Sequence, residues 1–224
     1  MSILFTICAR KGSKGLKGKN LINLNGKYLI MHTYDFVKKL KIKKDIVVST
    51  DSNKIQKLVG KKNCWFIRSK NLSGDKISKI KVILDAVKKA ELKNNKIYQT
   101  IIDLDVTSPL RTMEDFYNCF SKFKKKNYNN LFTVTNASKN PYFNMVEIKK
   151  DKINLVKKNQ NYSSRQNAPQ VFSMNASIYI WKRKTLFSNK PLFNHKTGIY
   201  IMPKSRSFDI DDVVDLKIVK CLSK

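Results

Sequence analysis

The chain has 224 residues, 42% of them hydrophobic and 10% aromatic, and a formal net charge of +30. This size and apolar content predict a globular protein with one substantial core, not a disordered chain. No apolar run approaches the roughly 20 residues of a transmembrane helix, and no secretory leader is visible, so we expect a cytoplasmic protein without membrane association. The four cysteines form no CxxC pair and the two histidines lie in unrelated contexts, which argues against disulfide frameworks and His-rich catalytic or metal sites.

The positive charge raises the possibility of nucleic-acid binding, since basic surfaces attract phosphate backbones. However, only six of the 46 basic residues are arginines, and sequence-reading proteins rely heavily on the bidentate arginine fork. The lysines are spread over the whole length, as in KKLKIKK and KFKKKN. This pattern favours a general drift of composition toward lysine. We expect no nucleic-acid partner, and nucleic-acid binding is the weaker alternative.

The first two thirds of the chain alternate between short apolar runs and amphipathic segments of helical spacing. The apolar runs predict strands over 3–8, 45–50, 64–68, 100–106 and 131–136. The segments with helical spacing predict helices over 29–40, 53–62, 77–90 and 113–126. Strands separated by helices indicate βαβ units and a largely parallel sheet.

The pattern changes after Asn140. The segment 144–158 predicts a β-hairpin with its turn at Asp151 and Lys152. Strands over 176–181 and 199–203 and a closing helix over 211–222 follow. Because no internal repeat and no Pro/Gly-rich linker is present, we expect a single α/β domain over 1–224 that carries a hairpin excursion.

Three unusual loops follow predicted strands. They are ARKGSKGLKGKN after the first strand, TDS after the second and TSPLR after the strand at 100–106. In open parallel sheets, ligands bind beyond the carboxyl ends of the strands. One pocket could therefore gather all three loops.

The opening loop, within ICARKGSKGLKGKN, is flexible and cationic and contains no acidic residue. It has neither the Walker A spacing nor the dinucleotide fingerprint, because its glycines follow GxxGxxG. Glycines allow backbone N–H groups to converge on an anion, and Arg10, Lys14 and Lys19 add positive charge. This predicts a polyphosphate-binding loop. The alternative is one more solvated patch on a basic protein.

A second feature is SFDIDDVVD at residues 207–215. On an extended segment Asp209 and Asp211 share one face, while Ile210 turns toward the core. Two carboxylates one strand repeat apart form a potential Mg²⁺ site, because hard cations prefer oxygen ligands. The alternative is that Asp211 or Asp212 caps the final helix, although Asp209 lies too early in the chain for capping.

Five ordered blocks, spread over nearly the whole chain, resemble the acylneuraminate cytidylyltransferases, which activate nonulosonic acids as CMP-sugars. The blocks are ICARKGSKGLKGKN, VVSTDSNKI, LDVTSPLRTMEDF, RQNAPQVFSMNASIYIW and SFDIDDVVDLKIV. Within the family, DLDVTSPLR, NPYFNMVEI and RQNAPQVFSMNASIYIW are most similar to the CMP-legionaminic acid synthetase branch.

The resemblance implies a Rossmann-like three-layer nucleotidyltransferase fold. Its sheet is mostly parallel with helices on both faces, and a protruding β-hairpin at 138–170 serves as a dimerisation arm that completes the sugar site of the partner in a homodimer. It also implies that CTP and a 2-keto sugar acid give a CMP-sugar and pyrophosphate, with Mg²⁺. The anomeric 2-hydroxyl then attacks the α-phosphorus, so catalysis is mostly positioning and charge neutralisation.

The resemblance also implies roles for individual residues. The catalytic residues are then Arg10, Lys19, Asp209 and Asp211, where both aspartates bind Mg²⁺ and Asp211 is the candidate base. The nucleotide-binding residues are Ala9, Arg10, Gly12, Ser13, Lys14, Gly15, Lys19, Asn20 and Arg68. The sugar-binding residues are Asp75, Ser78, Lys79, Asp105, Arg165, Gln166, Asn175, Tyr179 and Phe193. For the aromatic residues, core packing is an open alternative.

Two departures from the family pattern concern the sugar. Asp105 stands where the sialic acid enzymes carry glutamine, and Phe143 stands where some of them carry lysine. Aspartate only accepts hydrogen bonds, whereas glutamine also donates. The loss of a cation and the gain of an aromatic ring favour a less polar sugar such as legionaminic acid. N-acetylneuraminic acid is the main alternative substrate, and pseudaminic acid and Kdo are others. A further alternative is a nucleotidyltransferase-like scaffold that has lost its catalytic activity.

Overall fold

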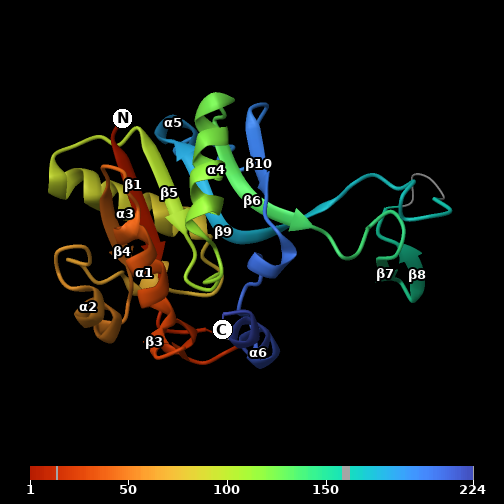
Figure 1. Cartoon of the computed structure of the whole chain (residues 1–224), viewed down its shortest axis with the longest axis horizontal. Coiled ribbons are helices and arrows are strands. Elements are labelled where there is room, and N and C mark those ends of the chain that lie inside the picture. The colour runs from red at the N-terminus through yellow and green to blue at the C-terminus, as the bar shows by residue number, and fades with distance from the viewer. Residues whose placement is uncertain (14, 158–161, 224) are drawn as a thin grey trace.

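A six-stranded sheet forms the centre of the protein in the computed structural model, which describes residues 1–13, 15–157 and 162–223. Its strand order is β10-β6-β9-β5-β1-β4 (Figure 1). The strands are β1 (Ile3–Cys8), β4 (Asp45–Ser49), β5 (Thr100–Leu104), β6 (Asn130–Asn136), β9 (Phe172–Lys182) and β10 (Thr197–Ile201). All neighbouring pairs are parallel except those of β9, which is antiparallel to β5 and β6. The predicted mostly parallel sheet is confirmed.

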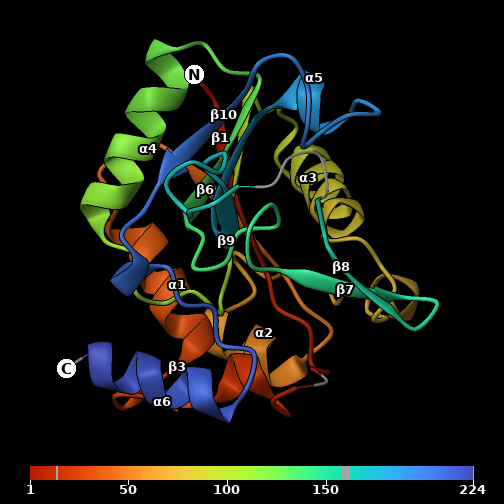
Figure 2. The same cartoon turned by 90° about the vertical axis from the view of Figure 1, so that its right-hand side faces the viewer.

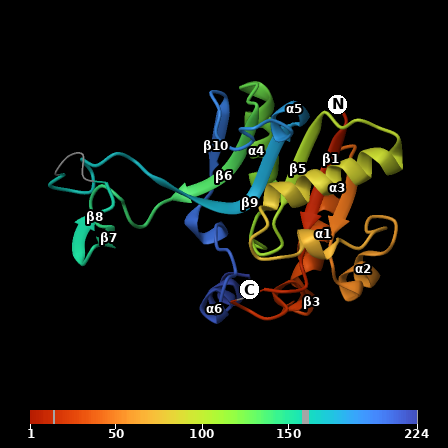
Figure 3. The same ribbon diagram turned by 180° about the vertical axis from the view of Figure 1, so that it is seen from behind.

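Helices cover both faces of this sheet, which gives three layers (Figures 2 and 3). Helices α1 (Leu29–Lys39) and α4 (Met113–Lys125) lie on one face, and α3 (Lys79–Asn94) lies on the other. The closing helix α6 (Val213–Leu222) lies beside β3 (Lys27–Tyr28). The remaining elements are α2 (Asn53–Val59), α5 (Arg183–Leu186), β2 (Asn23–Leu24), β7 (Val146–Lys149), β8 (Lys152–Leu155) and 3-10 turns at Lys19–Leu21, Lys70–Leu72 and Lys204–Arg206.

The central strands are apolar on both faces because both faces are buried. On β1 the side chain of Phe5 joins the core beneath α1 and α4, whereas its neighbour Leu4 joins the core beneath α3. On β5, Ile102 joins the core beneath α1 and α4, and its neighbour Ile101 joins the core beneath α3. Successive residues of a strand point to opposite faces, so a continuous apolar run fills two cores at once.

The strand predicted at 64–68 is wrong. This segment runs beside the edge strand β4 and is joined to it by isolated backbone bonds, from Val48 N–H to Asn63 O at 2.7 Å and from Arg68 N–H to Thr50 O at 2.7 Å. Two separate bonds do not make a ladder. The predicted helix at 53–62 is also too long, because Gly60 adopts φ 86° and ends α2.

The predicted hairpin is present but its turn lies one residue earlier. Lys149 pairs with Lys152, so the turn residues are Lys150 and Asp151, and both have positive φ, 49° and 59°. This combination is a type I′ turn, whose twist matches that of a two-residue hairpin. The hairpin β7-β8 projects from the body of the protein, as Figure 1 shows.

The described residues include no helix that is long and apolar enough to cross a membrane. The cytoplasmic location stays a prediction, as does the single-domain organisation with its excursion at 138–170.

Candidate active site

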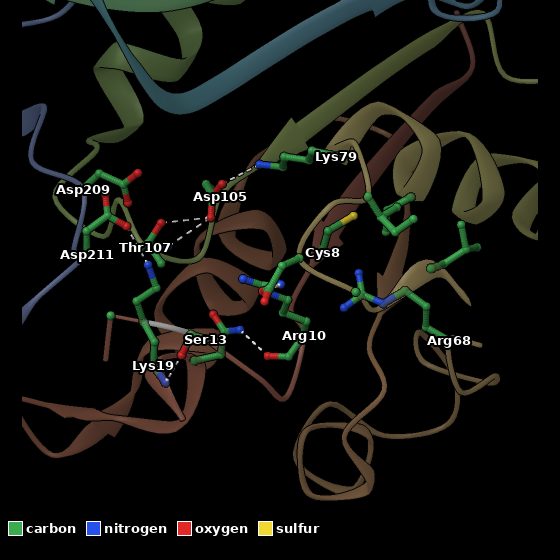
Figure 4. Close-up of a pocket in the computed structure, with 17 residues that line it drawn as sticks. Cys8, Arg10, Ser13, Lys19, Arg68, Lys79, Asp105, Thr107, Asp209 and Asp211 are labelled. Carbon is green, nitrogen blue, oxygen red and sulfur yellow. Dashed lines mark hydrogen bonds and ion pairs between the residues drawn. The ribbon is translucent and has the colours of Figure 1, made fainter. Parts of the chain in front are cut away.

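The loops at the carboxyl ends of β1, β4 and β5 surround a cavity of about 570 Å³ (Figure 4). Its lining comes from the segments 8–20, 68–82, 105–107 and 209–211. The parallel pairing of β1 with both β4 and β5 brings these segments to one edge of the sheet. The predicted site residues that line the cavity are Arg10, Ser13, Gly15, Lys19, Asn20, Arg68, Asp75, Lys79, Asp105, Asp209 and Asp211.

The glycine-rich loop after β1 is held by its own polar side chains. The Asn20 amide donates to the carbonyl of Arg10 at 2.8 Å, and the Ser13 hydroxyl donates to the carbonyl of Leu16. The Lys19 N–H in turn donates to the Ser13 hydroxyl at 3.3 Å. The loop is therefore shaped without a ligand, and Asn20 acts by fixing its backbone.

Gly15 is the point where this loop meets the acidic segment. A Cβ atom on Gly15 would lie 2.3 Å from the carbonyl oxygen of Asp211, a separation that no real side chain tolerates. Gly12, by contrast, has open space around it. The glycine at position 15 is required because two backbones approach each other there.

The acidic segment is anchored so that its carboxylates point into the cavity. The Ile210 N–H donates to the carbonyl of Thr107 at 2.9 Å, and the Ile210 side chain is fully buried. Helix α6 is capped by Asp212, which accepts from the N–H groups of Val214 and Asp215. Asp211 is therefore free of capping, and its carboxylate pairs with the Lys19 ammonium at 2.8 Å.

Asp209 is half-buried, and one of its carboxylate oxygens is buried without compensation. Its Oδ1 atom has no hydrogen-bond partner among the described residues. Burial, followed by the nearby charge of Asp105, raises the pKa of the Asp209 carboxyl to about 6. A buried, orphaned carboxylate oxygen beside a second carboxylate suits a divalent cation, which would supply the missing charge. No group of three candidate ligands occurs among the described residues, so water and substrate oxygens would complete the shell.

Besides Lys79, three cationic side chains of the described residues line the cavity. The Arg10 guanidinium pairs with Asp75, and Lys19 pairs with Asp211. Arg68 is 5% exposed, and its Nε and Nη2 atoms have no hydrogen-bond partner among the described residues; the carboxylate of Asp51 lies 3.7 Å from Nη2. Donors left unpaired in a buried place are positioned to bind the acceptor atoms of an anionic ligand.

The loop after β5 carries a residue that sequence reasoning missed. The buried guanidinium of Arg111 donates to the carbonyl of Asp105 and, at 3.0 and 3.1 Å, to the hydroxyls of Ser177 and Thr33. It thereby holds the loop that presents Asp105 and Thr107 to the cavity. The scarcity of arginine in the chain is the signal that could have pointed to it.

A second residue missed from the sequence is Asp103, fully buried on β5. Its Oδ2 lies 2.8 Å from the Lys79 ammonium, which also pairs with Asp105. Burial alone would raise the pKa of the Asp105 carboxyl, but the charge and hydrogen bond of Lys79 outweigh it and lower this pKa to about 2. Asp105 therefore stays ionised and paired.

Several predicted sugar-binding residues lie outside this cavity. Ser78 and Tyr179 line a separate recess, and Phe193 is 65% exposed and packs its ring edge-on against Phe132. Asn175 is buried: its amide oxygen accepts from the Thr133 hydroxyl at 2.6 Å, and its amide nitrogen donates to the Ser207 hydroxyl at 3.0 Å, so these contacts are structural.

The expected carboxylate-binding pair lies on the arm. Arg165 and Gln166 are exposed, and the Arg165 guanidinium donates to the carbonyl of Ala137 at 2.6 Å. Of the expected nucleotide-binding residues, Ala9 is buried beneath the loop and Gly12 does not line the cavity. Lys14 lies outside the described residues.

The arrangement is that of an enzyme that handles a phosphorylated nucleotide: a glycine-rich cationic loop opposite a carboxylate pair on an α/β sheet. A family model described as cytidylyltransferase matches residues 4–221. The chain therefore belongs to the cytidylyltransferase family.

Named relatives narrow the comparison. The chain is 41% identical to the post-translational flagellin modification protein B of Campylobacter coli, over 99% of this chain and 95% of the relative. It is 40% identical to the CMP-N,N'-diacetyllegionaminic acid synthase of Campylobacter jejuni, over 98% of this chain and 94% of the relative. A CMP:2-keto-3-deoxy-manno-octonic acid synthetase solved with CTP matches with a TM-score of 0.67 and 16% identity, covering 100% of this chain and 98% of that one. The structural match confirms the fold.

Proposed function

We propose that the protein transfers CMP from CTP to the anomeric 2-hydroxyl of a nonulosonic acid, preferably a legionaminic acid, and releases pyrophosphate. The observation that carries the proposal is the single cavity in which Arg10, Lys19 and Arg68 lie with the carboxylates of Asp209 and Asp211. The named synthases among the relatives support the substrate class.

The cationic side chains would bind the triphosphate. Arg10 and Lys19 extend from the glycine-rich loop, and both are now paired with carboxylates that phosphate oxygens would replace. Neutralising the charge that develops on pyrophosphate as it leaves is the main electrostatic task in such a reaction. The orphaned donors of Arg68 would bind acceptor atoms of the nucleotide.

Asp209 and Asp211 would hold Mg²⁺, since their oxygens fit a hard cation. When bound, the ion supplies charge neutralisation at the reacting phosphate. Asp211 is also the candidate acceptor for the proton of the sugar hydroxyl, because its carboxylate is more exposed to the cavity than that of Asp209. The new bond joins the sugar oxygen to the α-phosphorus, and the bond from the α-phosphorus to pyrophosphate breaks.

The arm supports a homodimer as the working unit. In the register of β7 and β8, Val146 pairs with Leu155 and Ile148 pairs with Ile153, so the four side chains share one face. Ile148 and Ile153 are 73% and 71% exposed. An amphipathic hairpin that projects an apolar face into solvent suits burial against a second copy, which would bring Arg165 toward the site of that copy.

The test combines purified protein with CTP, Mg²⁺ and a panel of legionaminic, pseudaminic and N-acetylneuraminic acids and Kdo. Mass spectrometry then detects CMP-sugars, with the D209N variant as the negative control. We expect product from legionaminic acid above all. Product mainly from N-acetylneuraminic acid would favour the alternative, a CMP-N-acetylneuraminate synthetase, and no product with any sugar would refute the proposed activity.

A further inference from the structure

Lys79 lies where two cavities meet. It begins α3 and lines both the 570 Å³ cavity and a smaller recess of about 160 Å³. Figure 4 shows it reaching toward Asp105, on the side of the cavity away from Lys19. The recess is mostly apolar and aromatic, and its other lining residues are Ser78, Ile80, Ile83, Tyr179, Trp181 and Leu192.

The carboxylates beside Lys79 already have donors. Asp105 Oδ1 accepts from the N–H and hydroxyl of Thr107 at 3.3 and 3.1 Å, and its Oδ2 accepts from Lys79. Asp103 Oδ1 accepts from the Thr6 hydroxyl at 2.7 Å, and its Oδ2 pairs with Lys79 at 2.8 Å. Asp105 is thus committed to the protein, so its oxygens are poorly placed to recognise a sugar.

The ammonium group has capacity to spare. Of its three N–H donors, the hydrogen bond to Asp105 uses one, Asp103 lies beside it as an ion-pair partner at 2.8 Å, and 35% of the Lys79 side chain is exposed. Burial alone would lower the pKa of this ammonium, but Asp103 and Asp105 outweigh that effect and hold it well above its usual range. The ring of Tyr179 lies 5.8 Å from Nζ, on the side of the recess. The position therefore offers a fixed, permanently charged donor next to an apolar space.

We propose that Lys79 determines specificity for an N-acylated sugar acid, by donating a hydrogen bond to the acyl carbonyl while the acyl chain enters the recess beside Tyr179. The proposal rests on the function proposed above. An amide carbonyl accepts from Lys79, and its methyl group gains apolar contact. A free amine at the same carbon would offer Lys79 no carbonyl acceptor and the recess no methyl group, so it would gain neither contact. A recess of 160 Å³ admits a few heavy atoms, which suits a short acyl chain but not a sugar ring.

The test compares Lys79→Met with the unmodified protein on pairs of nonulosonic acids that differ only in one N-acyl group, present or removed to the amine. Lys79→Met keeps the apolar stem and removes the donor. Lys81→Met is the matched control, because Lys81 is an exposed lysine on the same helix and the change of net charge is the same. Initial rates give kcat/KM for each sugar and, separately, KM for CTP.

We expect the unmodified protein to prefer the acylated sugar by about 100-fold or more, and Lys79→Met to reduce that ratio to below about 10-fold through KM for the sugar. KM for CTP should stay within about 2-fold, and Lys81→Met should behave like the unmodified protein. An equal loss of kcat/KM on both sugars, or a change confined to KM for CTP, would show a merely structural role for Lys79. Either result would overturn this inference and leave the proposed function standing. An unmodified protein that converts none of the sugars would instead overturn the proposed function and this inference with it.

A second variant keeps the inference testable if Lys79→Met fails to fold. Ile80→Phe narrows the recess and leaves all three charges in place. We expect it to accept N-acetyl sugars but to lose most of its activity on N-butanoyl analogues that the unmodified protein still converts. Unchanged tolerance of the longer acyl chain would overturn the placement of the acyl group.

Discussion

At the scale of single residues, the site depends on atoms that leave no room for substitution. Gly15 has the carbonyl of Asp211 where a Cβ would be, and Asp209 has a buried oxygen with no partner among the described residues. One feature is steric and the other electrostatic. Each predicts a variant with a matched control.

Gly15→Ala should push the glycine-rich loop away from Asp211 and misplace Lys19. We expect kcat/KM for CTP to fall by about 100-fold, since small displacements of positioning groups have large effects. Gly12→Ala, at a position with open space and no positive φ, should change it by less than about 2-fold. Steady-state kinetics on both variants is the measurement, and equal effects would contradict the steric reason.

Asp209→Asn should abolish turnover yet stabilise the metal-free protein. The pKa of this carboxyl is raised from 3.8 to about 6 in the folded protein. Its protonated form therefore leaves the fold at full stability below about pH 3.8, and its ionisation lowers the free energy of unfolding as the pH rises through about 6. In EDTA at pH 8 the variant should melt about 5 °C higher than the unmodified protein, and at pH 4 the two should nearly coincide. Asp85→Asn, which removes a carboxylate from a half-buried helix pair with Lys89, is the control. A lower melting temperature at pH 8 would show that the carboxylate is already compensated.

At the scale of elements, one buried carboxylate links a helix to a distant segment. Asp115 is fully buried, accepts from Thr112 in the capping box of α4, and forms a two-point ion pair with Arg206 at 2.8 and 2.9 Å. Arg206 lies in the turn that leads to Asp209. The capping residue thus ties α4 to the acidic segment of the site.

Asp115→Asn should lower stability by about 2 kcal/mol, or about 6 °C, because Arg206 loses its counter-charge. Burial would raise the pKa of the Asp115 carboxyl, but the bonds from Arg206 and Thr112 outweigh it and lower the pKa below 3.8. A lowered pKa stabilises the fold above the unfolded value, so the deficit should be full at pH 7 and shrink as pH falls below about 4. Melting curves across pH measure this, with Asp35→Asn at an exposed pair as the control. A deficit independent of pH would point to packing instead.

At the scale of the whole molecule, the projecting hairpin is the feature that a single chain does not explain. The double variant Ile148→Lys, Ile153→Lys should convert a dimer to a monomer, because two charges on the apolar face oppose burial. Sedimentation velocity measures the change. Lys149→Ala with Lys152→Ala, on the opposite face, should leave the dimer intact, and a monomeric unmodified protein would contradict the proposal.

Mixing two inactive variants tests whether Arg165 serves the site of the partner. Arg165→Ala and Asp209→Asn each damage a different part of the same site. If that site combines Asp209 of one copy with Arg165 of the other, exchange of subunits should restore about a quarter of the unmodified activity. Mixtures that stay inactive after complete exchange, which labelled subunits would show, mean that Arg165 acts within its own chain or not at all.

The sequence by itself determined the features that depend on neighbouring residues. Apolar runs and helical spacing predicted the central strands and the helices, and the glycine-rich loop and the pair Asp209 and Asp211 stood out by local composition. The prediction from sequence failed at the edge of the sheet. The apolar segment 64–68 has the composition of a strand, but only isolated backbone hydrogen bonds join it to β4.

The tertiary structure alone decided the contacts between segments far apart in the chain. Lys79 joins Asp103 and Asp105, Gly15 packs on Asp211, and Arg111 holds the loop after β5. No periodicity records such contacts, because they depend on how the strands order themselves in the sheet. That order brings the charged loops to one edge, and there their charges, burial and unpaired atoms give the site its chemistry.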